Sequence, residues 1–144
     1  METQKSQDLE PIKITGVIAD EVGVPRNDSG PGSSLYEVPF QLSQKPSDLW
    51  AQLFVDSWNR PPEFTSMHRP GIARVEGDRI VLDGTTIEEV ERYHLKTLKL
   101  AVQRANELTV EWFRSRQQRD RGESERQEEH RRRVKEAAKR LRFD

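Results

Sequence analysis

The sequence predicts a two-layer α+β domain with a four-stranded, mainly antiparallel sheet, one short helix and one long C-terminal helix that extends past the domain. Three observations predict this fold. Four short segments have the composition of strands, a helical repeat separates the second from the third, and another helical repeat follows the fourth. The expected order is therefore strand, strand, helix, strand, strand, helix, with the helices on one face of the sheet.

The first two strands are expected at residues 12–20 and 35–43, on either side of a loop rich in glycine, proline and serine at 23–34. The second strand contains Pro39, which has no backbone N–H to donate to a neighbouring strand. We therefore expect this strand to lie at an edge of the sheet or to carry a bulge at the proline.

A helix is expected between Ser47 or Asp48, either of which can cap its first turn, and Asn59, which precedes a pair of prolines by two positions. Aromatic residues recur at every fourth position of this segment, so they share one face of the helix. That face is expected to cover the sheet. The aromatic residues are Trp50, Phe54 and Trp58.

The last two strands are expected at about 72–76 and 79–83, joined by a tight turn in which Gly77 supplies a positive φ. The long helix follows from residue 86 to about 118. Its start resembles a capping box, with either Thr85 or Thr86 as the N-cap and a glutamate three positions later. A helix of that length is on the order of 50 Å long.

Apolar and small residues of the long helix recur in steps of three and four, close to a heptad repeat. A body of about 100 residues has a radius of gyration of only ~13 Å, so one sheet cannot cover the whole helix. We expect the part through Ala101 to lie on the sheet and the later part to need another cover. The residues expected to form an interface are Leu98, Val102, Leu108, Trp112 and Phe113.

A second copy of the chain, in a homodimer, is the favoured cover for these side chains. The alternatives are the aromatic residues of the short helix in the same chain and a different protein. The leading functional interpretation is therefore a non-enzymatic interaction, adaptor or assembly subunit that associates through its long helix.

Charge is distributed unevenly along the chain. The net charge is −1, but the residues from Arg114 to the end hold 12 Lys and Arg against 7 Asp and Glu, and the preceding residues hold 12 against 18. We expect a flexible N-terminus at 1–10, an α+β domain at 11–113, and a charged tail at 114–144 that is helical or disordered.

The tail ends in a basic segment with a narrow apolar stripe, a composition that favours contact with phosphates or acidic surfaces. The alternative function is therefore a nucleic-acid-associated protein that binds without sequence specificity, and a purely solubilising tail is the plain interpretation. The residues of the basic segment are Arg131, Arg132, Arg133, Lys135, Lys139, Arg140 and Arg142.

Chemical motifs are weak. The chain has no cysteine, which excludes thiolate chemistry and cysteine-bound zinc. Glu91 and His94 have the spacing of a di-iron carboxylate motif but lack the second pair that such sites need, so we expect no metal and no cofactor. A further alternative is a small enzyme with a site near the loop at 60–71, although no catalytic residue can be assigned. The candidate ligand-binding residues of that loop are Arg60, His68 and Arg69.

The N-terminal residues lack the basic and apolar segments of a secretory signal, and no apolar stretch approaches the ~18 residues that a membrane span needs. We therefore expect a cytoplasmic protein without a membrane partner.

Overall fold

The computed structural model describes residues 10–26, 34–63 and 66–143. The flexible N-terminus predicted at 1–10 therefore lies outside the described residues except for Glu10. The elements in chain order are β1 (Ile14–Val17), η1 (Ala19–Glu21), β2 (Tyr36–Leu42), α2 (Asp48–Asn59), β3 (Ala73–Glu76), β4 (Arg79–Thr85), α3 (Ile87–Glu89), a π-helical turn η2 (Val90–His94) and α4 (Leu95–Lys139).

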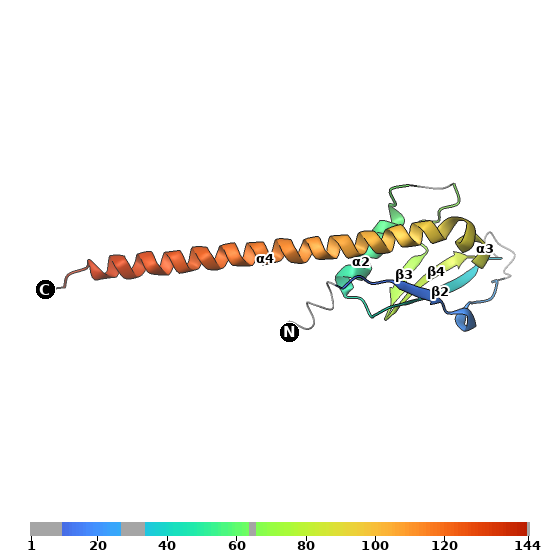
Figure 1. The fold of residues 1–144 in the computed structure, drawn as a ribbon, viewed down its shortest axis with the longest axis horizontal. Coiled ribbons are helices and arrows are strands. Elements are labelled where there is room, and N and C mark those ends of the chain that lie inside the picture. The colour runs from blue at the N-terminus through green and yellow to red at the C-terminus, as the bar shows by residue number, and fades with distance from the viewer. Residues whose placement is uncertain (1–9, 27–33, 64–65, 144) are drawn as a thin grey trace. The chain divides into compact units, whose positions relative to one another are not determined.

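The four strands form one sheet in the order β1-β2-β4-β3, and every neighbouring pair is antiparallel. This confirms the predicted α+β fold, with its short helix and its long C-terminal helix. The α2 helix and the first turns of α4 lie on the same side of the sheet (Figure 1). The turn between β3 and β4 contains Gly77 at φ 58°, as predicted for a tight hairpin.

The prediction that the proline strand lies at an edge or carries a bulge at the proline is wrong, because β2 lies between β1 and β4 and its register shift falls between Tyr36 and Glu37. The Pro39 carbonyl accepts a hydrogen bond of 3.0 Å from the N–H of Ile18, so this proline faces β1. The last residue of β1 is Val17, which pairs with Phe40. The missing N–H of Pro39 therefore falls just beyond the end of the β1 ladder, where little pairing is lost.

The core lies between the sheet and the two helices. Alternate residues of β2 and β4 point into it, which is the period expected of a sheet with one face against helices. Trp50 and Phe54 of α2 stack with ring centroids 5.5 Å apart, and both are buried as predicted. The largest fully buried side chains are Trp50, Trp58, Phe40, Phe54, Ile80, Leu82 and Leu98.

Both helix starts follow the predicted capping chemistry. The Ser47 hydroxyl accepts the Trp50 N–H at 3.1 Å, and the Thr86 hydroxyl accepts the Glu89 N–H at 3.0 Å. The second cap is only half of a capping box, because the Glu89 carboxylate binds elsewhere. Of the two N-caps that the sequence allows here, the structure therefore has Thr86.

The sequence predicts that the long helix ends near residue 118, whereas α4 ends at Lys139. The residues between contain no proline and only one glycine, Gly122, so nothing in the sequence forces an earlier end. The chain divides into two compact units, Met1–Val110 and Glu111–Asp144.

Candidate functional site

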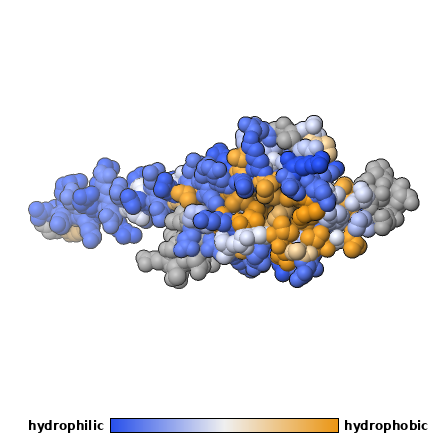
Figure 2. Space-filling view, turned by 45° about the vertical axis from the view of Figure 1, so that its right-hand side comes forward, coloured by the Kyte–Doolittle hydropathy of each residue, from blue (hydrophilic) through white to orange (hydrophobic). Residues whose placement is uncertain are grey.

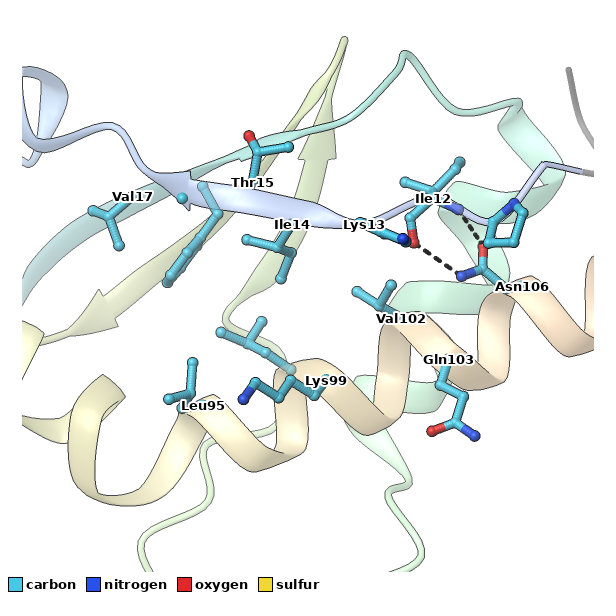
Figure 3. Close-up of a pocket in the computed structure, with 14 residues that line it drawn as sticks. Ile12, Lys13, Ile14, Thr15, Val17, Leu95, Lys99, Val102, Gln103 and Asn106 are labelled. Atoms are coloured by element: carbon cyan, nitrogen blue, oxygen red, sulfur yellow. Dashed lines mark hydrogen bonds between the residues drawn. The ribbon is translucent and has the colours of Figure 1, made fainter.

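A groove of about 500 Å³ runs between β1 and the first turns of α4 (Figure 3). Side chains of β1 and of α4 point toward each other across it. Ile14 and Val17 come from the strand, and Leu95 and Val102 come from the helix. Phe40 of β2, Leu98 of α4, and Pro11 and Ile12 before β1 add to the apolar lining.

Part of this apolar lining is open to solvent. Val17 is 41% exposed and Leu95 is 43% exposed. Apolar side chains also gather on the face of the domain drawn in Figure 2. Large exposed apolar residues that cluster around a groove are typical of binding surfaces, whereas scattered ones are not.

Asn106 closes one end of the groove by binding the backbone of Ile12. Its Oδ1 accepts the Ile12 N–H at 3.0 Å, and its Nδ2 donates to the Ile12 carbonyl at 2.9 Å. The same Oδ1 also accepts the indole N–H of Trp50 at 2.8 Å. The side-chain amide of Asn106 therefore binds both backbone groups of one residue, as the backbone of a neighbouring strand would.

Two of the five polar residues that line the groove are positively charged, and the other three are neutral. Lys13 and Lys99 both line it, and no aspartate or glutamate does. Within the described parts of the chain, neither lysine is in an ion pair, whereas the nearby Lys96 pairs with Glu63 at 3.0 Å. Apolar residues thus predominate in the lining of the groove, and its two charged residues are lysines that pair with no described carboxylate.

A second cluster surrounds the π-helical turn. His94 is fully buried at the end of this turn, with its ring 5.5 Å from the ring of Trp58 and 6.5 Å from that of His68. Among the residues that the structure describes, neither ring nitrogen of His94 has a hydrogen-bond partner, and its Nε2 is 3.7 Å from Glu89 Oε1. Burial, the largest cause, lowers the pKa of His94 below its ordinary value.

An ion pair fixes the loop before β3 to the start of the long helix. The Arg69 guanidinium binds both carboxylate oxygens of Glu89, at 2.9 and 2.8 Å, and the Thr85 hydroxyl donates to the same carboxylate at 2.9 Å. The hydrogen bond from Arg69 is the main cause that lowers the pKa of Glu89. Glu89 is therefore held as a carboxylate beside the buried His94.

The predicted ligand-binding loop is only partly assembled. His68 and Arg69 lie together at the Trp58 end of α2, where His68 Nε2 is 2.8 Å from the Trp58 carbonyl and the Trp58 indole donates to the Arg69 carbonyl at 3.0 Å. Arg60, by contrast, is exposed and lines a separate small hollow. These contacts hold the loop in place, and the enzyme alternative stays a prediction.

Two acidic residues that could serve such an enzyme are paired elsewhere. Glu63 pairs with Lys96, and Asp83 pairs with Arg74 at 3.3 Å. Among the described residues, no group of three or more His, Asp or Glu side chains is arranged to hold a metal ion.

In the second unit, Trp112 and Phe113 form an edge-to-face pair with ring centroids 4.9 Å apart. Trp112 is 37% exposed, and the Arg116 guanidinium lies 5.2 Å from the centre of its ring. Of the other residues predicted to form an interface, Leu108 is half-buried, whereas Leu98 and Val102 belong to the core and to the lining of the groove.

All seven residues of the basic segment are exposed. Five of them lie within α4, and Arg140 and Arg142 follow its end at Lys139. Arg133 pairs with Glu129 at 2.7 Å, one helical turn away. The predicted contact with nucleic acid stays a prediction.

Sequence reasoning missed the groove, and it missed Lys13, Lys99 and Asn106 as site residues. A polar Asn106 in the apolar face of a helix was a usable signal, because buried amides need partners. Its partners could not be identified, since Ile12 lies 94 positions earlier in the sequence.

The chain matches no family model, no curated protein and no solved structure. Within the described residues, no helix is both long and apolar enough to cross a membrane.

Proposed function

We propose that the protein is a non-enzymatic interaction or assembly subunit that associates through α4, and that its partner is a second copy of the chain. The observation that carries this proposal is the absence of any buried residue among the described positions from Glu111 to Lys139, a stretch that nevertheless contains an exposed tryptophan beside a phenylalanine.

A helix gains most of its stability in a protein from packing one face against another element. None of the described helix residues after Val110 is buried, so a partner helix would supply the packed face that they lack. Aromatic residues are the commonest anchors of protein interfaces, because each buries a large area. Trp112 and Phe113 are therefore the proposed anchors.

The test is the mass of the protein in solution, measured by light scattering over a range of concentrations. We expect the wild-type chain to reach twice its 16.8 kDa, and the dimer of the variant Trp112→Ser to dissociate at concentrations that are tens to hundreds of times higher. Loss of a buried tryptophan at an interface costs about 2–4 kcal/mol, which gives that factor.

Val134→Ser is the matched control, because it removes an exposed apolar side chain from the same helix, away from the aromatic pair. It should leave the association unchanged. A wild-type chain with the mass of one copy at every concentration would rule out self-association. Equal effects of the two substitutions would show that the aromatic pair is not the anchor.

A further inference from the structure

The open side of β1 is available for pairing. β1 is the last strand of the described sheet, and its other side pairs with β2. Along a strand, the backbone groups of successive residues face opposite sides. The groups of Lys13 face β2, because its N–H binds the Ser43 hydroxyl and its carbonyl accepts the Ser43 N–H. The backbone groups of Ile14 therefore face the open side, next to the groove.

A bulge between Ile14 and Gly16 shifts this alternation by one residue. Val17 consequently faces the open side as well, since the next residue, Ile18, turns its N–H back to the Pro39 carbonyl. The side chains of Ile14 and Val17 both point into the groove (Figure 3). The groove thus combines backbone donors and acceptors with apolar side chains along one strand.

At Ile12 the open side of the strand is already occupied by the side chain of Asn106. Its amide makes the two hydrogen bonds that a neighbouring strand would make to Ile12, at 3.0 and 2.9 Å. The next outward-facing residue is Ile14, for which α4 offers Val102 and Leu95 across the groove rather than an amide. A polypeptide backbone can take the place beyond Asn106.

We propose that the groove binds an extended segment of a partner protein, which pairs with β1 as a fifth strand and carries acidic side chains. Strand addition satisfies the backbone groups, and the apolar walls accept alternate side chains. The positive charges of Lys13 and Lys99, with no carboxylate in the lining, favour acidic residues in the segment.

Other occupants fit less well. A partner helix has no free backbone groups to offer β1, and an acyl chain would fill the apolar walls while leaving the same groups unpaired. Lysines and bulges on edge strands can also prevent unwanted strand pairing between proteins. The experiment below distinguishes this protective role from the binding of a partner segment. The proposal does not depend on association through Trp112, because every residue involved belongs to the unit Met1–Val110.

The probe is a seven-residue peptide, blocked at both ends, with valine at its second, fourth and sixth positions, threonine between them and glutamate at each end. Binding to the full-length chain is followed by fluorescence anisotropy and by the backbone amide NMR signals. We expect the amide signals of Ile14 and Val17 to shift. A peptide with methylated backbone nitrogens on the pairing edge should lose at least tenfold in affinity, because it cannot donate to β1.

The contribution of charge to binding is tested by reversing the charge of a lysine in the groove and of the peptide ends. Lys99→Glu should weaken binding of the glutamate peptide about fivefold to tenfold and should strengthen binding of a peptide with lysine at both ends. Lys45→Glu is the control, since Lys45 is exposed and does not line the groove. Trp112→Ser should bind the peptide as the wild type does, so failure of self-association would leave this result intact.

Equal binding of the methylated peptide would overturn strand addition and leave only an apolar groove. No binding of the peptide, or amide shifts confined to residues outside β1 and the start of α4, would show that the lysines and the bulge protect the edge instead.

Discussion

The two parts of α4 have the same backbone structure but different surroundings. Between Leu95 and Val110 the helix has six buried residues, and between Glu111 and Lys139 none of the described residues is buried. The first part is helical because its apolar face packs on the sheet and on α2. The described residues of the second part form no such face, so local interactions, together with the partner helix proposed above, must hold it.

The composition of each part explains the difference. The buried residues of the first part are small or apolar and recur every three or four positions, which gives one continuous stripe: Thr97, Leu98, Ala101, Val102, Ala105 and Thr109. The second part alternates charges of both signs, of which Glu129 and Arg133 form a pair one turn apart. Pairs of this kind contribute only about 0.2–0.5 kcal/mol each.

The largest effect should come from replacing a tryptophan of the packed unit. Replacing a tryptophan in the unpacked part of α4 should have a much smaller effect. Trp58 is fully buried and donates to the Arg69 carbonyl, so Trp58→Ala should lower the free energy of unfolding by about 3–5 kcal/mol. Trp112→Ala should lower it by less than about 1 kcal/mol in the monomer. Urea unfolding followed by near-UV circular dichroism measures both. Similar losses for the two would contradict the contrast between the packed and unpacked parts.

A smaller effect should come from pH, and only in the packed unit. Burial lowers the pKa of His94, so the ring takes up its proton at a lower pH in the folded protein than in the unfolded chain, where it does so near the ordinary pKa of 6.5. The unfolded state then binds more protons, and the free energy of unfolding should fall as the pH drops below 6.5, by up to about 1.4 kcal/mol per pH unit.

His94→Gln should remove most of this dependence between pH 7 and pH 5. The charged and titratable groups around the ring are Glu89, Arg69 and His68. Glu89 contributes in another range, because its pKa is lowered and its contribution is lost only as the pH falls through the range below 4.5. Urea titrations at four pH values give the slope. An unchanged slope in the variant would exclude His94 as its source.

The smallest effect should appear in the unpacked unit. Gly122 is the one glycine of α4, and a Cβ added there would be 3.5 Å from Arg126 Nη1, an ordinary contact. Gly122→Ala should therefore stabilise the local helix by about 1 kcal/mol. Slower amide hydrogen exchange around residue 122, with an unchanged unfolding midpoint of the sheet, is the expected result. A raised midpoint would show that the two units unfold together.

Local signals predicted the elements well. Ser47, Thr86 and Gly77 each act through neighbours within three or four positions, so the sequence pattern alone locates two helix starts and a hairpin turn. The aromatic repeat of α2 was also sufficient to predict which of its residues are buried. These features are confirmed because their physical causes lie within one turn or one strand.

Features that depend on distant residues could not be predicted. The strand order places the proline strand inside the sheet. Little pairing is lost there, because β1 ends before it reaches Pro39. The π-helical turn at Val90–His94 contains no proline or glycine that would have predicted an irregular helix there. The groove exists because β1 and α4 are side by side, and their pairing through Ile12 and Asn106 joins residues from opposite ends of the domain.

The bonds between Ile12 and Asn106 also have a consequence for synthesis. The first strand leaves the ribosome early, but the amide that holds its start is not made until the helix is well under way. Until then, among the described strands only β2 pairs with β1 and keeps it in register, and non-local contacts such as that of Asn106 form late in folding. Newly made chains should therefore expose the Ile12 end of this edge to other nascent chains until Asn106 is in place.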